Sequence, residues 1–156
     1  MPLVLAGGRG WKMDDIEAFI KSLGIESHVI MTAYVSDDEL IWLYRNCYAN
    51  IYPSLFEGFG LPVLEGMQFG APTIAAASTS IPEVADNAAI LIEPEDMEAW
   101  SRALLKLSID KNLRNQLRKK AVSRASHFAW NASGKALLEL YQKATSLPKR
   151  MVKGTK

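Results

Sequence analysis

The chain has 156 residues, within the ~100–200 residues of one domain, and at that length roughly two thirds of the unfolded surface can be buried. With 49% hydrophobic and 22% charged residues, the composition is that of a globular protein and excludes a wholly disordered chain. No apolar run reaches the ~18 residues of a membrane-spanning helix, and we expect no signal peptide. The single cysteine, Cys47, excludes an intrachain disulfide or a cysteine-based zinc site, and we expect a cytoplasmic protein that binds no metal.

The net charge of +1 conceals a strong asymmetry along the chain. Residues 1–100 carry 4 Lys/Arg against 15 Asp/Glu, whereas residues 101–156 carry 14 against 2. Two interpretations stay open: solvated lysine-rich helices, or peripheral contact of this basic segment with the inner face of a membrane. We expect no nucleic-acid partner.

Short apolar runs alternate with helical segments along most of the chain. In chain order the expected elements are a strand at 3–6, a helix at 14–23, a strand at 28–33, a helix from 36 to 44, a strand at 49–53, a helix at 61–69, a strand at 72–76, a short helix at 80–85, a strand at 88–92, and helices at 97–107, 113–128 and 131–144. Ser36 and Glu39 form a predicted capping box, and Pro62 stands at the tolerated first-turn position of its helix.

This alternation predicts an α/β fold, a Rossmann-like parallel sheet with helices on both faces. We expect one domain over residues 1–146 and a basic flexible tail over residues 147–156. Ligands of such sheets bind beyond the carboxyl ends of the strands, which directs attention to the loops at 7–11, 33–36, 54–60 and 77–81.

The most informative segment is residues 54–65, SLFEGFGLPVLE. Its glycines leave the backbone uncovered before a helix, so the N–H groups of Phe59, Gly60 and Leu61 suit a phosphate or diphosphate. Glu57 and Glu65 would bracket the same ligand, and a carboxylate accepts hydrogen bonds from vicinal hydroxyls. The alternative is that Glu57 is a solvated loop residue and Glu65 only complements the helix dipole.

The segment from Glu57 to Glu65 resembles the Glu-x7-Glu motif of retaining group 1 glycosyltransferases, which have the GT-B fold. The resemblance extends to residues 3–11 (LVLAGGRGW), 33–40 (AYVSDDEL), 81–84 (IPEV) and 128–130 (FAW), and covers roughly residues 3–145. It implies a nucleotide-diphospho-sugar donor without a further cofactor, with GDP-mannose as the first candidate.

The resemblance also implies a role for each matched residue. Glu57, the catalytic candidate, would hold hydroxyls of the donor sugar, and Glu65 would bind the ribose. The remaining implied donor-binding residues are Phe59, Gly60 and Leu61 at the diphosphate, Tyr34 and Val35 at the base, and Gly8 and Arg9 near the phosphates.

Members of this family have two Rossmann-like domains, and this chain resembles the second one without its first βα unit. We therefore expect a missing N-terminal acceptor domain, and a hexosyltransferase that is inactive or incomplete as this chain alone. The alternatives are a non-catalytic remnant, or a nucleotide-binding module that needs a separate N-terminal partner.

Overall fold

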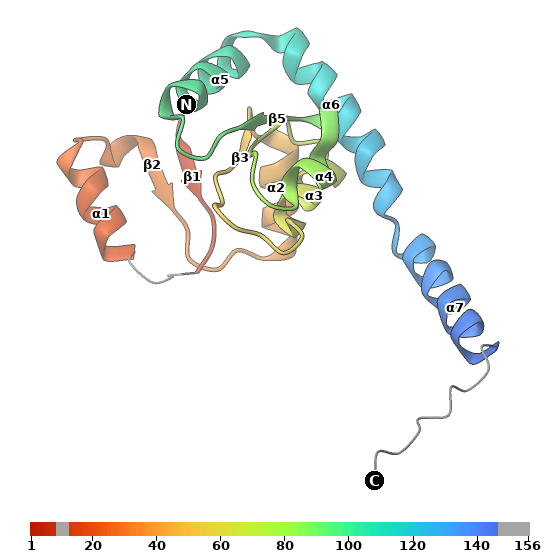
Figure 1. Ribbon diagram of the computed structural model, residues 1–156. Coiled ribbons are helices and arrows are strands. Elements are labelled where there is room, and N and C mark those ends of the chain that lie inside the picture. The colour runs from red at the N-terminus through yellow and green to blue at the C-terminus, as the bar shows by residue number, and fades with distance from the viewer. Residues whose placement is uncertain (9–12, 147–156) are drawn as a thin grey trace. The chain divides into compact units, whose positions relative to one another are not determined.

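The computed structural model describes residues 1–8 and 13–146, in two compact units, Met1–Cys47 and Tyr48–Lys156 (Figure 1). Each unit contains its own parallel sheet, with strand order β1-β2 in the first and β3-β4-β5 in the second. The predicted parallel α/β class is confirmed, although the five strands pair as two sheets because each pairs only within its own unit. One domain over residues 1–146 stays a prediction, and the predicted tail at 147–156 lies outside the described residues.

The first unit is a short βαβα segment. Its elements are β1 (Leu3–Leu5), α1 (Met13–Ser22), a 3-10 turn η1 (Glu26–His28), β2 (Val29–Met31) and α2 (Asp37–Asn46). The predicted second strand begins one residue late, because the His28 N–H donates to Ile25 O at 2.8 Å and closes the 3-10 turn. The predicted capping box of α2 is confirmed, since the Ser36 N–H donates to Glu39 Oε2 at 2.7 Å and the Glu39 N–H to Ser36 Oγ at 3.3 Å.

The second unit continues the same alternation and then becomes helical. Its elements are β3 (Asn50–Tyr52), α3 (Leu61–Gln68), β4 (Thr73–Ala76), α4 (Ile81–Ala85), η2 (Asp86–Ala88), β5 (Ala89–Ile92), α5 (Met97–Ile109), α6 (Lys111–Ala125), η3 (Ser126–Phe128) and α7 (Trp130–Ser146). The predicted helix at 113–128 begins earlier, because the Asp110 side chain accepts from the Leu113 N–H at 2.9 Å and caps α6. No described helix has the length and apolarity needed to cross a membrane.

The core of the second unit surrounds its central strand, β4, which is buried along its whole length. Val63 and Met67 of α3, Trp100 and Leu107 of α5, and Leu117 of α6 belong to one hydrophobic cluster with this strand. By contrast, α7 buries none of its residues. The sheet edge that carries the loops at 54–60 and 77–81 is therefore held by packing around β4.

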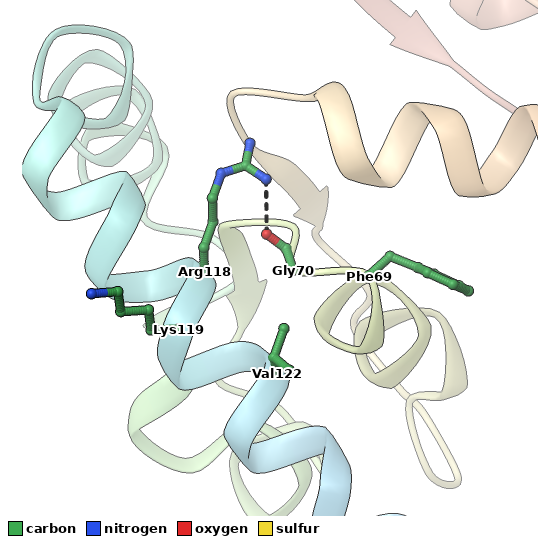
Figure 2. A pocket seen from close by; sticks show the side chains of 5 residues that line it. All are labelled: Phe69, Gly70, Arg118, Lys119 and Val122. Atoms are coloured by element: carbon green, nitrogen blue, oxygen red, sulfur yellow. Dashed lines mark hydrogen bonds between the residues drawn. The ribbon is translucent and has the colours of Figure 1, made fainter.

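The cations of α6 are not simply solvated, because several of them donate hydrogen bonds to carbonyl oxygens of other elements. Arg114 donates to Leu107 and Ser108 of α5, Arg118 to Gly70 after α3, Lys120 to Asn87 of η2, and Arg124 to Glu83 and Val84 of α4. Figure 2 shows the bond between Arg118 and Gly70, which is 3.0 Å long. Most of these acceptors lie at helix C-termini, where unpaired carbonyls and the negative end of the dipole favour a cation.

Replacing Arg124 by methionine should lower the free energy of unfolding by about 1–2 kcal/mol, because its bonds to the α4 carbonyls, 2.6 and 3.0 Å long, are lost. The guanidinium also lies over an aromatic ring, with 4.9 Å between Arg124 Cζ and the centroid of the Phe128 ring. Urea unfolding measures the change. The matched control is Arg102→Met, which removes an exposed pair with Glu98 and should cost at most ~0.5 kcal/mol. Equal losses in the two variants would contradict the capping role.

Candidate functional site

The loop of residues 54–60, here called the Glu57 loop, leaves the carboxyl end of β3 and leads into α3. Its Glu57 carboxylate is held through one oxygen: Oε1 accepts from the Tyr52 hydroxyl at 2.5 Å and from Ser54 Oγ at 2.8 Å. These two bonds, that of Tyr52 first, lower the pKa of Glu57 below its ordinary value, because they favour the charged form. Oε2 has no donor among the described residues and is available to a ligand.

A second loop, residues 77–80, follows β4 and is here called the hydroxyl loop. Ser78 Oγ donates to Ser54 O at 2.8 Å, and Ser80 Oγ donates to Glu57 O at 3.1 Å. The Glu57 N–H donates in turn to Thr79 Oγ1 at 3.0 Å. Sequence reasoning selected the loop at 77–81 for its position but assigned none of these hydroxyls. The available signal was the run Ser78-Thr79-Ser80 at the end of a buried strand.

Helix α3 begins on a glycine in the left-handed region. Gly60 is the N-cap residue, with φ +93° and ψ +41°, and a Cβ there would stand 3.4 Å from Ile81 Cγ1. Pro62 lies in the first turn and has no N–H. Within residues 1–8 and 13–146, the N–H groups of Phe59, Gly60 and Leu61 have no hydrogen-bond acceptor. The helix start therefore offers unpaired donors at the positive end of a helix dipole.

The side chains around this helix start have different surroundings. The Phe59 ring packs edge-on against Phe128, with centroids 5.9 Å apart and an interplanar angle of 88°. Leu61 and Glu65 are exposed, and Glu65 lies one turn into α3. The structure thus brings five predicted residues onto one loop-and-helix segment, whereas their contacts with a ligand stay predictions.

The other predicted residues belong to the first unit. Gly8 follows β1, and Tyr34 and Val35 follow β2, with the Tyr34 side chain 84% exposed. The two loops meet within that unit, since the Gly7 N–H donates to Thr32 Oγ1 at 3.4 Å. Arg9 lies outside the described residues.

Two other features of the described part of the chain bear on where a ligand could bind. No group of three His, Cys, Asp or Glu side chains there could hold a metal ion. An open hollow of about 510 Å³ is lined by Phe69, Gly70, Arg118, Lys119 and Val122 (Figure 2). It lies at the C-terminal end of α3, whereas the Glu57 loop leads into the opposite end of that helix.

Gly60→Ala should lower the free energy of unfolding by about 1–2 kcal/mol, because an L-residue is strained in the left-handed conformation. Denaturant unfolding measures this cost. The matched control is Gly58→Ala, where a Cβ meets nothing within 4 Å, and we expect its stability to be unchanged or raised by up to ~1 kcal/mol. A Gly60→Ala protein as stable as the control would show that the left-handed start of α3 is wrong.

Tyr52→Phe should raise the pKa of Glu57 toward its ordinary value, because the main hydrogen bond to the ionised form is removed. The folded-state pKa lies below the unfolded-state pKa, so this stabilisation is fully present above the unfolded-state pKa and is lost as the pH falls through the folded-state pKa. The variant should accordingly lose stability at neutral pH, with a difference that shrinks in acid. Carboxyl-carbon NMR titration measures the pKa of Glu57, and Tyr34→Phe is the control. An unchanged Glu57 titration in Tyr52→Phe would show that the Tyr52 hydrogen bond does not lower this pKa.

Comparisons with known proteins identify relatives of this chain by sequence and by fold. The family profile described as Glycosyl transferases group 1 matches residues 1–124. The O-antigen chain mannosyltransferase B of Escherichia coli is 35% identical over 129 residues, which cover 83% of this chain and 34% of that protein. The chain therefore spans about a third of that relative's length.

Two solved structures have a similar fold. The glycosyltransferase from Rickettsia africae ESF-5 has a TM-score of 0.85 and 19% identity, over 95% of this chain and 41% of that one. Anabaena Alr3699/HepE in complex with UDP has a TM-score of 0.83 and 20% identity, over 92% of this chain and 41% of that one. From the family match and the fold together, the chain belongs to the group 1 glycosyltransferases and has the fold of their C-terminal type of domain.

Proposed function

We propose that this chain binds the donor of a retaining hexosyltransferase, a nucleotide-diphospho-sugar. One observation carries the proposal: an ionised carboxylate with an open oxygen stands on the loop that leads into a helix start with three unpaired N–H groups. An amide-rich helix start suits a diphosphate, and a carboxylate oxygen suits the hydroxyl groups of a sugar. The two features together match both halves of such a donor.

The charge of each group determines which part of the donor it contacts. The N–H groups of Phe59, Gly60 and Leu61 donate to the diphosphate, whose negative charge the helix dipole also favours. The carboxylates of Glu57 and Glu65 would repel the phosphates, so they contact hydroxyls on either side of them: Glu57 those of the sugar and Glu65 those of the ribose. Glu57 thereby orients the reacting carbon.

In the proposed reaction the bond between the sugar carbon and the diphosphate oxygen breaks, and a bond to the acceptor oxygen forms on the same face. The electron pair leaves with the diphosphate, which also takes the proton of the acceptor hydroxyl. The donor amides at the start of α3 stabilise the charge that develops on this leaving group. Because the chain spans about a third of the mannosyltransferase that it resembles, we propose that the acceptor site lies on an N-terminal partner domain.

Two of the similar proteins suggest which donor to test first. The Escherichia coli relative is named a mannosyltransferase, which favours GDP-mannose, whereas Anabaena Alr3699/HepE was solved with UDP. GDP-mannose is the first candidate and a UDP-sugar the second. A cytoplasmic location, and contact of the basic segment at 101–156 with a membrane, stay predictions.

Glu65→Gln should weaken binding of a nucleoside diphosphate by roughly 1–3 kcal/mol, on the order of 5- to 150-fold, because a charged hydrogen-bond acceptor is lost. Calorimetric titration with GDP, UDP and ADP measures the affinity and ranks the bases. The matched control is Glu98→Gln, which neutralises an exposed glutamate in the first turn of α5 and should bind as the unmodified chain does.

Two results of this titration would contradict the proposal. One is the absence of binding by all three nucleotides at millimolar concentration. The other is equal weakening by Glu65→Gln and Glu98→Gln, which would indicate a general charge effect. Binding of a nucleotide without any contribution from its sugar would favour a non-catalytic nucleotide-binding module.

A further inference from the structure

We infer that Thr79 is a positioning residue for Glu57, and that the hydroxyl loop fixes the Glu57 loop against the carboxyl end of β4. The inference rests on the proposed function, because it concerns the same glutamate. Thr79 itself touches no reacting atom in this account. Its hydroxyl acts through the backbone of Glu57.

The hydroxyl loop holds the Glu57 loop at three backbone groups. Ser78 donates to the carbonyl of Ser54, 24 residues away, and Ser80 donates to the carbonyl of Glu57, 23 residues away. Thr79 accepts from the Glu57 N–H, 22 residues away. The N–H and the carbonyl of Glu57 are therefore both hydrogen-bonded to side chains that follow β4.

The Glu57 side chain is held by a different strand. Its Oε1 accepts from Tyr52, the last residue of β3, and from Ser54 just after that strand. The backbone of Glu57 thus depends on β4 and its carboxylate on β3. These two neighbouring strands pair in parallel, so the position of the open Oε2 is set from both sides.

The backbone of Thr79 supports a specific role for its hydroxyl. Thr79 has φ +47°, and a β-branched residue is rarely found in the left-handed region. Asp86 is the other non-glycine residue with positive φ in the described chain, and it is of the short polar type that tolerates this conformation. Glycine would fit better at position 79 but has no hydroxyl to accept the Glu57 N–H. Strain of this kind, held in place by surrounding bonds, is typical of functional sites.

The consequence is a selective effect on the sugar half of the donor. Small displacements of a group that orients a reacting atom have large effects on its contacts, whereas the amides at 59–61 would still bind the diphosphate. Loss of the Thr79 hydroxyl should therefore weaken the contribution of the sugar and spare that of the nucleoside diphosphate.

The experiment compares four variants of the full chain. Thr79→Val removes the hydroxyl and keeps the branched shape, whereas Thr79→Ser keeps the hydroxyl. Thr79→Gly removes the hydroxyl and relieves the strain, so it provides a foldable second test. Thr145→Val is the matched control on α7, where the hydroxyl bonds only within its own helix, to Tyr141 O and Gln142 O. Thermal unfolding and an amide NMR spectrum verify that each variant is folded.

Two quantities are measured on each variant. The first is the ratio of Kd for GDP-mannose to Kd for GDP, and of Kd for UDP-glucose to Kd for UDP. The second is the pKa of Glu57 by carboxyl-carbon NMR without ligand. We expect Thr79→Val and Thr79→Gly to raise the Kd ratio on the order of tenfold, with the Kd of the diphosphate changed by less than about twofold. Displacement of the Glu57 backbone should also weaken the bonds that Tyr52 and Ser54 donate to Oε1, so the pKa of Glu57 should rise toward its ordinary value in both variants. Thr79→Ser and Thr145→Val should behave as the unmodified chain.

Three results would overturn the inference. The first is a Thr79→Val protein in which the pKa of Glu57 is the same as in the unmodified chain. The second is a Thr79→Ser protein whose Kd ratio rises as much as that of Thr79→Val. The third is an equal loss of diphosphate and sugar binding, which would indicate a merely structural role. If the unmodified chain binds no nucleotide, the proposed function fails, and the ligand-free titration of Glu57 in Thr79→Val still decides the role of Thr79.

Discussion

The site depends on one backbone constraint, the left-handed conformation of Gly60 at the start of α3. Because Gly60 has no Cβ, it adopts φ +93° without strain and α3 begins directly after it, which leaves the amides at 59–61 without acceptors in the described chain. Ile81 is the first residue of α4, directly after the hydroxyl loop. Ile81 lies beside the start of α3, while Thr79, two residues earlier, accepts from the Glu57 N–H, so the amide donors and the carboxylate both lie next to the segment that follows β4.

The basic half of the chain has a structural role in the second unit. Arg114, Arg118 and Arg124 donate to carbonyl oxygens at or just after the ends of α5, α3 and α4, where helices leave acceptors unpaired. These bonds connect α6 to the helices that follow β3, β4 and β5. The charge asymmetry of the sequence is therefore partly explained by contacts within the fold, and it is not by itself evidence for an anionic partner.

Local signals in the sequence predicted the elements well, because helix caps and glycine stops act over a few residues. The capping box at Ser36 and Glu39 and the start of α3 at Gly60 are examples. The pairing of strands into two sheets, and the bonds from the hydroxyl loop to residues 22–24 positions away, depend on tertiary contacts that no local pattern contains. Glu57 could be selected from its motif, whereas its donors Tyr52 and Ser54 could be identified only from the geometry.

The proposed function requires that the start of α3 bind the diphosphate of the donor. Amide chemical-shift mapping during titration of the chain with GDP and with UDP tests it most directly, because each backbone N–H reports its own hydrogen bond. We expect the largest shifts at Phe59, Gly60 and Leu61. Shifts confined to the basic hollow around Arg118 and Lys119, with none at the start of α3, would contradict it.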